Sequence, residues 1–189
     1  IAQKGGCLTA VQLEKSGMTL VSFRRVKAYL ERGKVYQLGL PYYAENIDPL
    51  EDLEEMITMQ IRNEGVDDGA SALLKDLRAA IMRTEDKMRE KADAMIRSNK
   101  ECMSDSFSTI RNGHICIPVK KEYKFRISGS VMDKSSTGNT LFIEPTSVAK
   151  YYEELQNLKL DEENEERRIL YTLSAMVADE SEVLQQDIK

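Results

Sequence analysis

Apolar side chains in the first third of the chain recur at helical spacing, which predicts two helices joined by an irregular connection. Between residues 8 and 31 the spacing is helical rather than alternating, and Thr9 is a suitable N-cap for a helix there. Asp48 followed by Pro49 predicts a second helix, because proline at the first helical position loses no useful hydrogen bond. We expect this shorter helix to end near Asn63.

A polar turn at residues 64 to 69 separates this region from a much longer apolar stripe. The stripe follows a repeat of about seven residues, with charged side chains on the other faces. Its members are Leu73, Leu74, Leu77, Ile81, Met88, Ala92 and Met95. The pattern indicates a long helix that packs along a partner and continues to about Asp105. We therefore expect a helical core over residues 1 to 72 and an ascending helix over residues 73 to 106.

From residue 107 the helical spacing gives way to three short runs of strand-forming residues. The first run is interrupted by Asn112 and Gly113, a dipeptide typical of β-hairpins. The second run alternates apolar and polar residues from 123 to 128, and the third covers residues 141 to 143. We expect these runs to pair as antiparallel strands in a β-rich tip that spans residues 107 to 146.

A second long helix is predicted to begin near Ser147 and to occupy residues 147 to 189. Its apolar stripe contains Val148, Tyr152, Leu155, Leu158, Ile169, Leu173, Met176 and Val183. Residues 161 to 168 carry no apolar side chain, so we expect this stretch to be solvated rather than part of a fully buried bundle. The elements together predict an α+β, mainly helical fold. It would contain a long antiparallel helical lever, a small antiparallel β-sheet at the tip of the lever, and a helical base.

The composition is that of a cytoplasmic protein without a membrane span. Charged residues make up 31% of the chain and no stretch approaches the roughly 20 apolar residues that a bilayer-spanning helix needs. Cys7, Cys102 and Cys116 are far apart and lack metal-ligand spacing, so we expect reduced, buried thiols and no zinc site. Because the chain begins at Ile1 with no basic or apolar leader, we interpret it as an internal piece of a longer protein.

Positive charge gathers in the predicted tip, although the formal net charge of the chain is -5. From residue 111 to residue 134 there are six basic side chains against two acidic ones, a local excess of +4. The basic residues are Arg111, Lys120, Lys121, Lys124, Arg126 and Lys134. Cations on a small sheet attract phosphates, whereas the acidic stretch from 153 to 166 repels them. We therefore take these six residues as candidate nucleic-acid-binding residues that contact the backbone rather than the bases.

Two aromatic side chains, Tyr123 and Phe125, are interleaved with these charges. They are placed to pack on sugars or bases of a bound nucleic acid. Alternatively, they form the core of the tip and the lysines are a solvated face. The sequence by itself favours neither interpretation.

Patterns for ATP binding and catalysis are missing from the chain. Gly33 precedes Lys34, but Ala28 occupies the position where a phosphate-binding loop needs its first glycine. The chain has one histidine, and it has no serine elbow and no cluster of metal ligands. We expect no catalytic residue, no metal site and no cofactor in this chain.

Asp133 and Glu144 are the one carboxylate pair that suggests metal-dependent cleavage. We favour a structural interpretation, in which Asp133 organises a turn and Glu144 caps the second long helix near its positive end. His114 is interpreted as a surface or hairpin histidine rather than a ligand.

A continuous string begins with an IPVK element at Ile117 to Lys120 and ends with LFIEP at Leu141 to Pro145. Its further characteristic positions are Tyr123, Lys124, Gly129, Asp133, Ser135, Gly138 and Thr140. This string resembles the clamp of the bacterial MutS-family paralogue that lacks the mismatch-reading domain. Lys4 to Gly6 and Val66 to Ser71 resemble two further segments of the same family, so the resemblance covers nearly the whole chain.

The chain departs from the family pattern at two places. His114 stands where the family often has arginine after glycine. Tyr152 and Glu153 replace a familiar pair of asparagines at the start of the second long helix.

The resemblance implies the core, lever and clamp of a nucleic-acid-binding ATPase. It further implies that the intact protein continues into a domain that binds ATP and magnesium and, in many relatives, into a nuclease-like domain. Members of the family are associated with branched DNA in recombination control and with stalled ribosomes, and a homodimer is expected. The rival interpretation is a structural coiled-coil scaffold or dimerisation module that makes no direct contact with nucleic acid.

Overall fold

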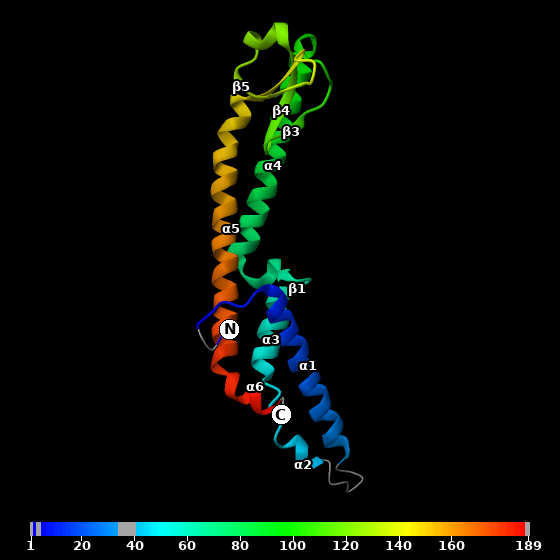
Figure 1. The fold of residues 1–189 in the computed structure, drawn as a ribbon, viewed down its shortest axis with the longest axis vertical. Helices are drawn as coiled ribbons and strands as arrows, with labels where there is room; N and C mark the ends of the chain where they lie inside the picture. The colour runs from blue at the N-terminus through cyan, green and yellow to red at the C-terminus, as the bar shows by residue number, and fades with distance from the viewer. Residues whose placement is uncertain (1, 3–4, 34–40, 188–189) are drawn as a thin grey trace. The chain divides into compact units, whose positions relative to one another are not determined.

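The structure of the chain is a computed structural model that describes residues 2, 5 to 33 and 41 to 187 (Figure 1). The chain divides into two compact units, one formed by residues 1 to 75 with 163 to 189 and the other by residues 76 to 162. Lys4, part of a segment that carries the family resemblance, lies outside the described residues.

The first unit is helical, with one small hairpin. Its elements are α1 (Ala10–Arg32), α2 (Pro41–Ala44), α3 (Glu51–Gln60), β1 (Ile61–Arg62), β2 (Gly65–Val66), the 3-10 helix η3 (Asp68–Ala70) and α6 (Ser181–Asp187). It also takes in the first residues of α4 (Ala72–Ser98) and the last part of α5 (Thr146–Asp179). The predicted N-cap is confirmed, because the Thr9 hydroxyl accepts a hydrogen bond from the Gln12 amide while the Gln12 side chain accepts one from the Thr9 amide.

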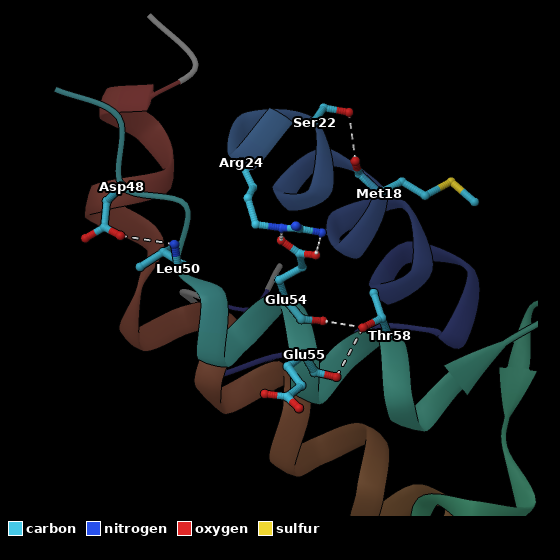
Figure 2. A network of polar contacts seen from close by, with 8 residues as sticks. All are labelled: Met18, Ser22, Arg24, Asp48, Leu50, Glu54, Glu55 and Thr58. Atoms are coloured by element: carbon cyan, nitrogen blue, oxygen red, sulfur yellow. Dashed lines mark hydrogen bonds and ion pairs between the residues drawn. The ribbon is translucent and has the colours of Figure 1, made fainter. Parts of the chain in front are cut away.

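Helices α1 and α3 pack closely in this unit. Their shared core is Leu13, Leu20, Leu53, Ile57 and Ile61, joined by Val66, Leu74, Ile169 and Leu173. Gly17 allows the close approach, since a Cβ at this position would lie 2.9 Å from Cγ2 of Ile57. Figure 2 shows that Arg24 of α1 reaches the buried carboxylate of Glu54 with two hydrogen bonds of 2.8 Å. This bidentate pair satisfies a charge that would otherwise be costly to bury.

Helix α3 is shorter than predicted at both ends. It begins at Glu51 because Leu50 is in the left-handed conformation (φ 45°), where its amide donates to the Asp48 carboxylate. It ends at Gln60 because the chain then turns into the β1–β2 hairpin. Asn63 and Glu64, at the turn of the hairpin, both have positive φ.

The second unit combines two antiparallel helical segments with a four-stranded sheet. Its other elements are η4 (Lys100–Cys102), β3 (Thr109–Arg111), β4 (His114–Lys120), η5 (Lys121–Arg126), β5 (Gly129–Lys134) and β6 (Thr140–Pro145). All strand pairs are antiparallel, in the order β3-β4-β6-β5. The prediction of an α+β, mainly helical fold is confirmed.

Within this unit, α4 and α5 run side by side in opposite directions (Figure 1). Arg78 pairs with Glu162 at 2.8 Å and Glu85 pairs with Lys159 at 2.9 Å, so residue numbers rise along α4 as they fall along α5. The two helices and the sheet share one core, formed by Ile81, Met88, Ala92, Ile96, Val148 and Leu155 with Ile117, Val119, Leu141 and Ile143. Part of each apolar stripe that predicted a long helix therefore forms the seam that supports the sheet.

Two predictions about local structure are wrong. The ascending helix ends at Ser98 rather than near Asp105, because Met103 already forms a β-bridge with Val119. The alternating run from 123 to 128 is mostly the 3-10 helix η5. Tyr123 in η5 and Ile127 directly after it face the core, and the residues between them are exposed.

The charged stretch from 161 to 168 is largely solvated, as predicted, with one exception. Most of its side chains are partly or fully exposed, but Glu165 is only 4% exposed. Its carboxylate accepts hydrogen bonds from the Ser71 hydroxyl at 2.7 Å and from Arg168 at 2.7 and 2.8 Å. These donors satisfy the one buried carboxylate of the stretch.

Candidate nucleic-acid interface

Strand register brings two of the predicted lysines to one end of the sheet. Lys120 pairs with Thr140 and Lys134 pairs with Leu141, so the two lysines flank the first residues of β6. The amide of Lys121 donates to the Asn139 carbonyl at 3.0 Å, which fixes η5 beside the turn between β5 and β6. We call residues 120 to 126 together with Lys134 the tip surface.

Three cations of the tip surface are exposed and unpaired. The side chains of Lys121, Lys124 and Lys134 form no ion pair within the described part of the chain. Lys124 lies 5.6 Å from the ring centre of its neighbour Phe125. Because no ion pair within the described residues neutralises them, these three lysines are available to attract an external anion.

Glu101 engages two further cations. Its carboxylate pairs with Arg126 at 2.6 Å, and its backbone carbonyl accepts a hydrogen bond from the Lys120 ammonium at 3.0 Å. The pKa of Arg126 is raised, through a hydrogen bond with Cys102 and through the negative charge of Glu101. Both partners of the ion pair are exposed, so the pair is weak and is readily exchanged for a competing phosphate.

Arg111 has a different environment from the other five candidates. It ends β3, its guanidinium lies 4.2 Å from the ring centre of Phe142, and its Nε lies 3.5 Å from a carboxylate oxygen of Asp133. The predicted set of six therefore divides into three unpaired lysines, two cations held by Glu101, and one arginine packed on the sheet.

The two aromatic residues of η5 differ in burial. Tyr123 is half-buried against the core of the unit, with the cationic groups of Lys120 and Arg126 at 5.9 and 5.7 Å from its ring centre. Phe125 is 95% exposed. The core interpretation is therefore confirmed for Tyr123 and wrong for Phe125, which lies on the surface.

The predicted roles of Glu144 and Asp133 are wrong. Glu144 does not cap α5; it is 6% exposed and its Oε1 lies 2.9 Å from Nδ1 of His114. Asp133 lies in β5 beside an irregularity in strand register, not in a turn, and it faces Arg111. His114 follows the turn formed by Asn112 and Gly113, both with positive φ, so the predicted β-hairpin is confirmed.

The three cysteines are free thiols. Cys102 and Cys116 are buried as predicted, whereas Cys7 is exposed, which the sequence did not indicate. Burial, reinforced by the negative charge of Glu144, raises the pKa of Cys116 to about 11. Its thiol is therefore protonated at neutral pH and a poor nucleophile.

The described residues contain neither a cluster of metal ligands nor a helix that could span a membrane. No group of three or more histidine, cysteine, aspartate or glutamate side chains has a geometry that would hold a metal ion. No helix in the described ranges combines the length and the apolar character that crossing a bilayer requires.

A sheet carried on two antiparallel helices agrees with the lever and clamp that the resemblance to the MutS family implies. Comparison with known proteins identifies the branch of this family. The chain is 37% identical over 192 residues to the Endonuclease MutS2 of Clostridium botulinum (strain Eklund 17B / Type B), covering 100% of this chain and 24% of that protein. The chain belongs to the MutS2 family.

Two other relatives agree. The Endonuclease MutS2 of Shouchella clausii (strain KSM-K16) is 38% identical over 187 residues, covering 95% of this chain and 24% of that protein. The Endonuclease MutS2 of Geobacillus sp. (strain WCH70) is 35% identical over 193 residues, covering 99% of this chain and 25% of that protein. The chain thus spans only a quarter of the length of these curated relatives. No family model matches it.

Proposed function

We propose that the tip surface binds the phosphate backbone of a nucleic acid. The observation that carries this proposal is the position of Lys121, Lys124 and Lys134, three exposed lysines without an ion-pair partner in the described ranges, at one end of a small sheet. Each lysine that contacts a phosphate releases condensed counterions, which favours binding whatever the base sequence.

The charge distribution around the tip surface supports the same proposal. The whole chain carries a formal net charge of -5, so it does not attract nucleic acid uniformly. Exposed carboxylates on α5, such as those of Glu153 and Glu154, repel phosphates from the helices. A nucleic acid would therefore approach the tip surface in preference to the helical seam.

The membership of the MutS2 family suggests the setting in which this surface works. In the intact protein we propose that an ATPase domain, with ATP and magnesium, changes the position of the clamp around branched DNA or the RNA of a stalled ribosome. The intact protein would act as a homodimer in the cytoplasm, and any nuclease activity would belong to parts of the protein beyond this chain. In this proposal the chain itself binds and does not catalyse.

The rival function is a structural scaffold, in which the lysines only increase solubility. The direct test is to titrate the 189-residue chain with branched DNA and with structured RNA at two salt concentrations. The variant Lys121→Glu/Lys124→Glu/Lys134→Glu should lose at least about 10-fold in affinity, because three phosphate contacts become repulsive. A greater loss on one of the two ligands would identify the preferred nucleic acid.

The matched control is Lys15→Glu/Lys75→Glu/Lys87→Glu, which makes the same change in net charge at exposed lysines of α1 and α4. This control should retain most of the affinity. Absence of binding by the unmodified chain at low salt, or equal losses in the two triple variants, would favour the scaffold.

A further inference from the structure

Phe125 is the most exposed of the large apolar side chains in the described residues. It is 95% exposed, compared with 62% for Phe107 and 60% for Ile110 in the same unit. A side chain of this size normally contributes to a core, and its neighbour Tyr123 does so. Phe125 therefore holds a large apolar surface in water without contributing to the packing of the chain.

The backbone around Phe125 is anchored on both sides. Tyr123 packs against the core of the unit and Ile127 is buried in it, at 6% exposure. The Lys121 amide is bonded to the Asn139 carbonyl. The ring thus projects from a fixed short helix, so little backbone order remains to be gained when a ligand covers it.

The side chains next to Phe125 indicate the chemistry of that ligand. Lys124 lies 5.6 Å from the ring centre, Lys121 belongs to the same 3-10 helix, and both are exposed. An aromatic face beside unpaired cations is complementary to a group that offers a flat ring next to phosphates. A nucleotide with an unpaired base has this structure, whereas the bases inside a duplex already cover each other's faces.

We infer that Phe125 stacks on an unpaired base while the neighbouring lysines hold the flanking phosphates. This inference rests on the proposed function and adds a specificity to it. Because only an unpaired base offers its face, the tip surface would prefer a junction or a single-stranded segment over a continuous duplex. The preference would require no reading of base sequence, since every base has an aromatic face.

The test compares two DNA ligands with equal numbers of phosphates, a blunt duplex and a forked duplex that carries 2-aminopurine as its first unpaired base. The 189-residue chain should bind the fork more tightly and quench its fluorescence. Phe125→Ala should weaken fork binding by about 5-fold or more, with little effect on the duplex. Phe125→Trp should retain both the preference and the quenching.

Phe107→Ala is the matched control, because it removes a second exposed phenylalanine of the same unit outside the tip surface. It should bind both ligands as the unmodified chain does. Equal binding of fork and duplex by the unmodified chain, or equal losses on both ligands in Phe125→Ala, would overturn the stacking but leave backbone binding intact. No binding to either ligand would overturn the proposed function together with this inference.

Discussion

His114 stacks on Tyr152, with ring centres 4.1 Å apart and ring planes inclined by 22°. These are two of the positions that the sequence analysis singled out as departures from the pattern of the family that the chain resembles. The contact joins the start of β4 to the first turns of α5. Glu144 completes the group through its contact with His114 Nδ1.

The first prediction concerns this group. In a double-mutant cycle of His114→Ala and Tyr152→Ala, we expect a coupling energy of about 0.5 to 1.5 kcal/mol, the usual range for a stacked aromatic pair. His114→Ala alone should lower the free energy of unfolding by about 1 to 3 kcal/mol beyond this coupling energy, because it leaves the buried Glu144 carboxylate without its partner. Urea denaturation measures these free energies of unfolding, and strictly additive single variants would contradict the coupling.

A second prediction concerns Glu165 and acid. Hydrogen bonds from Arg168 and then Ser71 lower the pKa of this carboxyl from 4.5 to about 2. A depressed pKa stabilises the fold above the unfolded-state pKa, and this contribution is lost as pH falls through the folded-state pKa. As pH falls from about 5 to 2, the free energy of unfolding of the unmodified chain should therefore decrease by up to about 2 to 3 kcal/mol more than that of Glu165→Gln. Acid titration of both proteins in urea denaturation measures this difference.

The control for this experiment is Glu163→Gln. Glu163 pairs with Arg167 at 2.8 Å in the same stretch of α5, but both side chains are about two-thirds exposed. Its substitution should change the free energy of unfolding by less than about 1 kcal/mol at any pH. If the free energies of unfolding of Glu165→Gln and Glu163→Gln depended on pH in the same way, the stabilising role of the buried Glu165 carboxylate would be contradicted.

The third prediction concerns Gly129, the first residue of β5. A Cβ at this position would overlap the carbonyl oxygen of Glu144 and lie 2.8 Å from Cγ2 of Ile143. Gly129→Ala must therefore displace β5 from β6, and we expect a loss of about 2 kcal/mol or more in the free energy of unfolding. Gly65→Ala is the control, because its Cβ would meet only one atom, at 3.9 Å. Equal stability of the two variants would contradict the close pairing at Gly129.

The fourth prediction concerns Glu101, which neutralises part of the tip surface. Glu101→Gln removes the negative charge next to Arg126 and keeps the backbone carbonyl that holds Lys120. Affinity for nucleic acid should rise by about 2- to 5-fold at low salt, with a steeper dependence on salt. Asp86→Asn makes the same change of charge at an exposed position of α4 and should have a smaller effect. An unchanged affinity would mean that Arg126 does not contact the ligand.

The long helices and the sheet could be predicted from the sequence because their signals are local. Apolar stripes at helical spacing specify α4 and α5, and the Asn112–Gly113 pair specifies the turn between β3 and β4. The burial of Glu165 could not be predicted, because it depends on Ser71, which is 94 residues away in the sequence. The same holds for the turn at Asn63 and Glu64, whose amides donate to the carboxylate of Glu14.

The candidate site was predicted in composition but not in detail. Charge counting selected Arg111 together with the five cations of the tip surface, since a local excess of basic residues is visible without a fold. It could not separate Arg126, paired with Glu101, from Lys121, which is unpaired in the described chain. It also could not distinguish Tyr123 from Phe125, because the alternating pattern of these residues suits a strand as well as a 3-10 turn.

The central claim is that Lys121, Lys124 and Lys134 contact phosphates, and the salt dependence of binding tests it most directly. The logarithm of the observed binding constant is measured against the logarithm of salt concentration, for the unmodified chain and for Lys121→Gln/Lys124→Gln/Lys134→Gln on one duplex. Each lost phosphate contact lowers the slope by about 0.9, so we expect the triple variant to be shallower by roughly 2 to 3. An unchanged slope would contradict the claim.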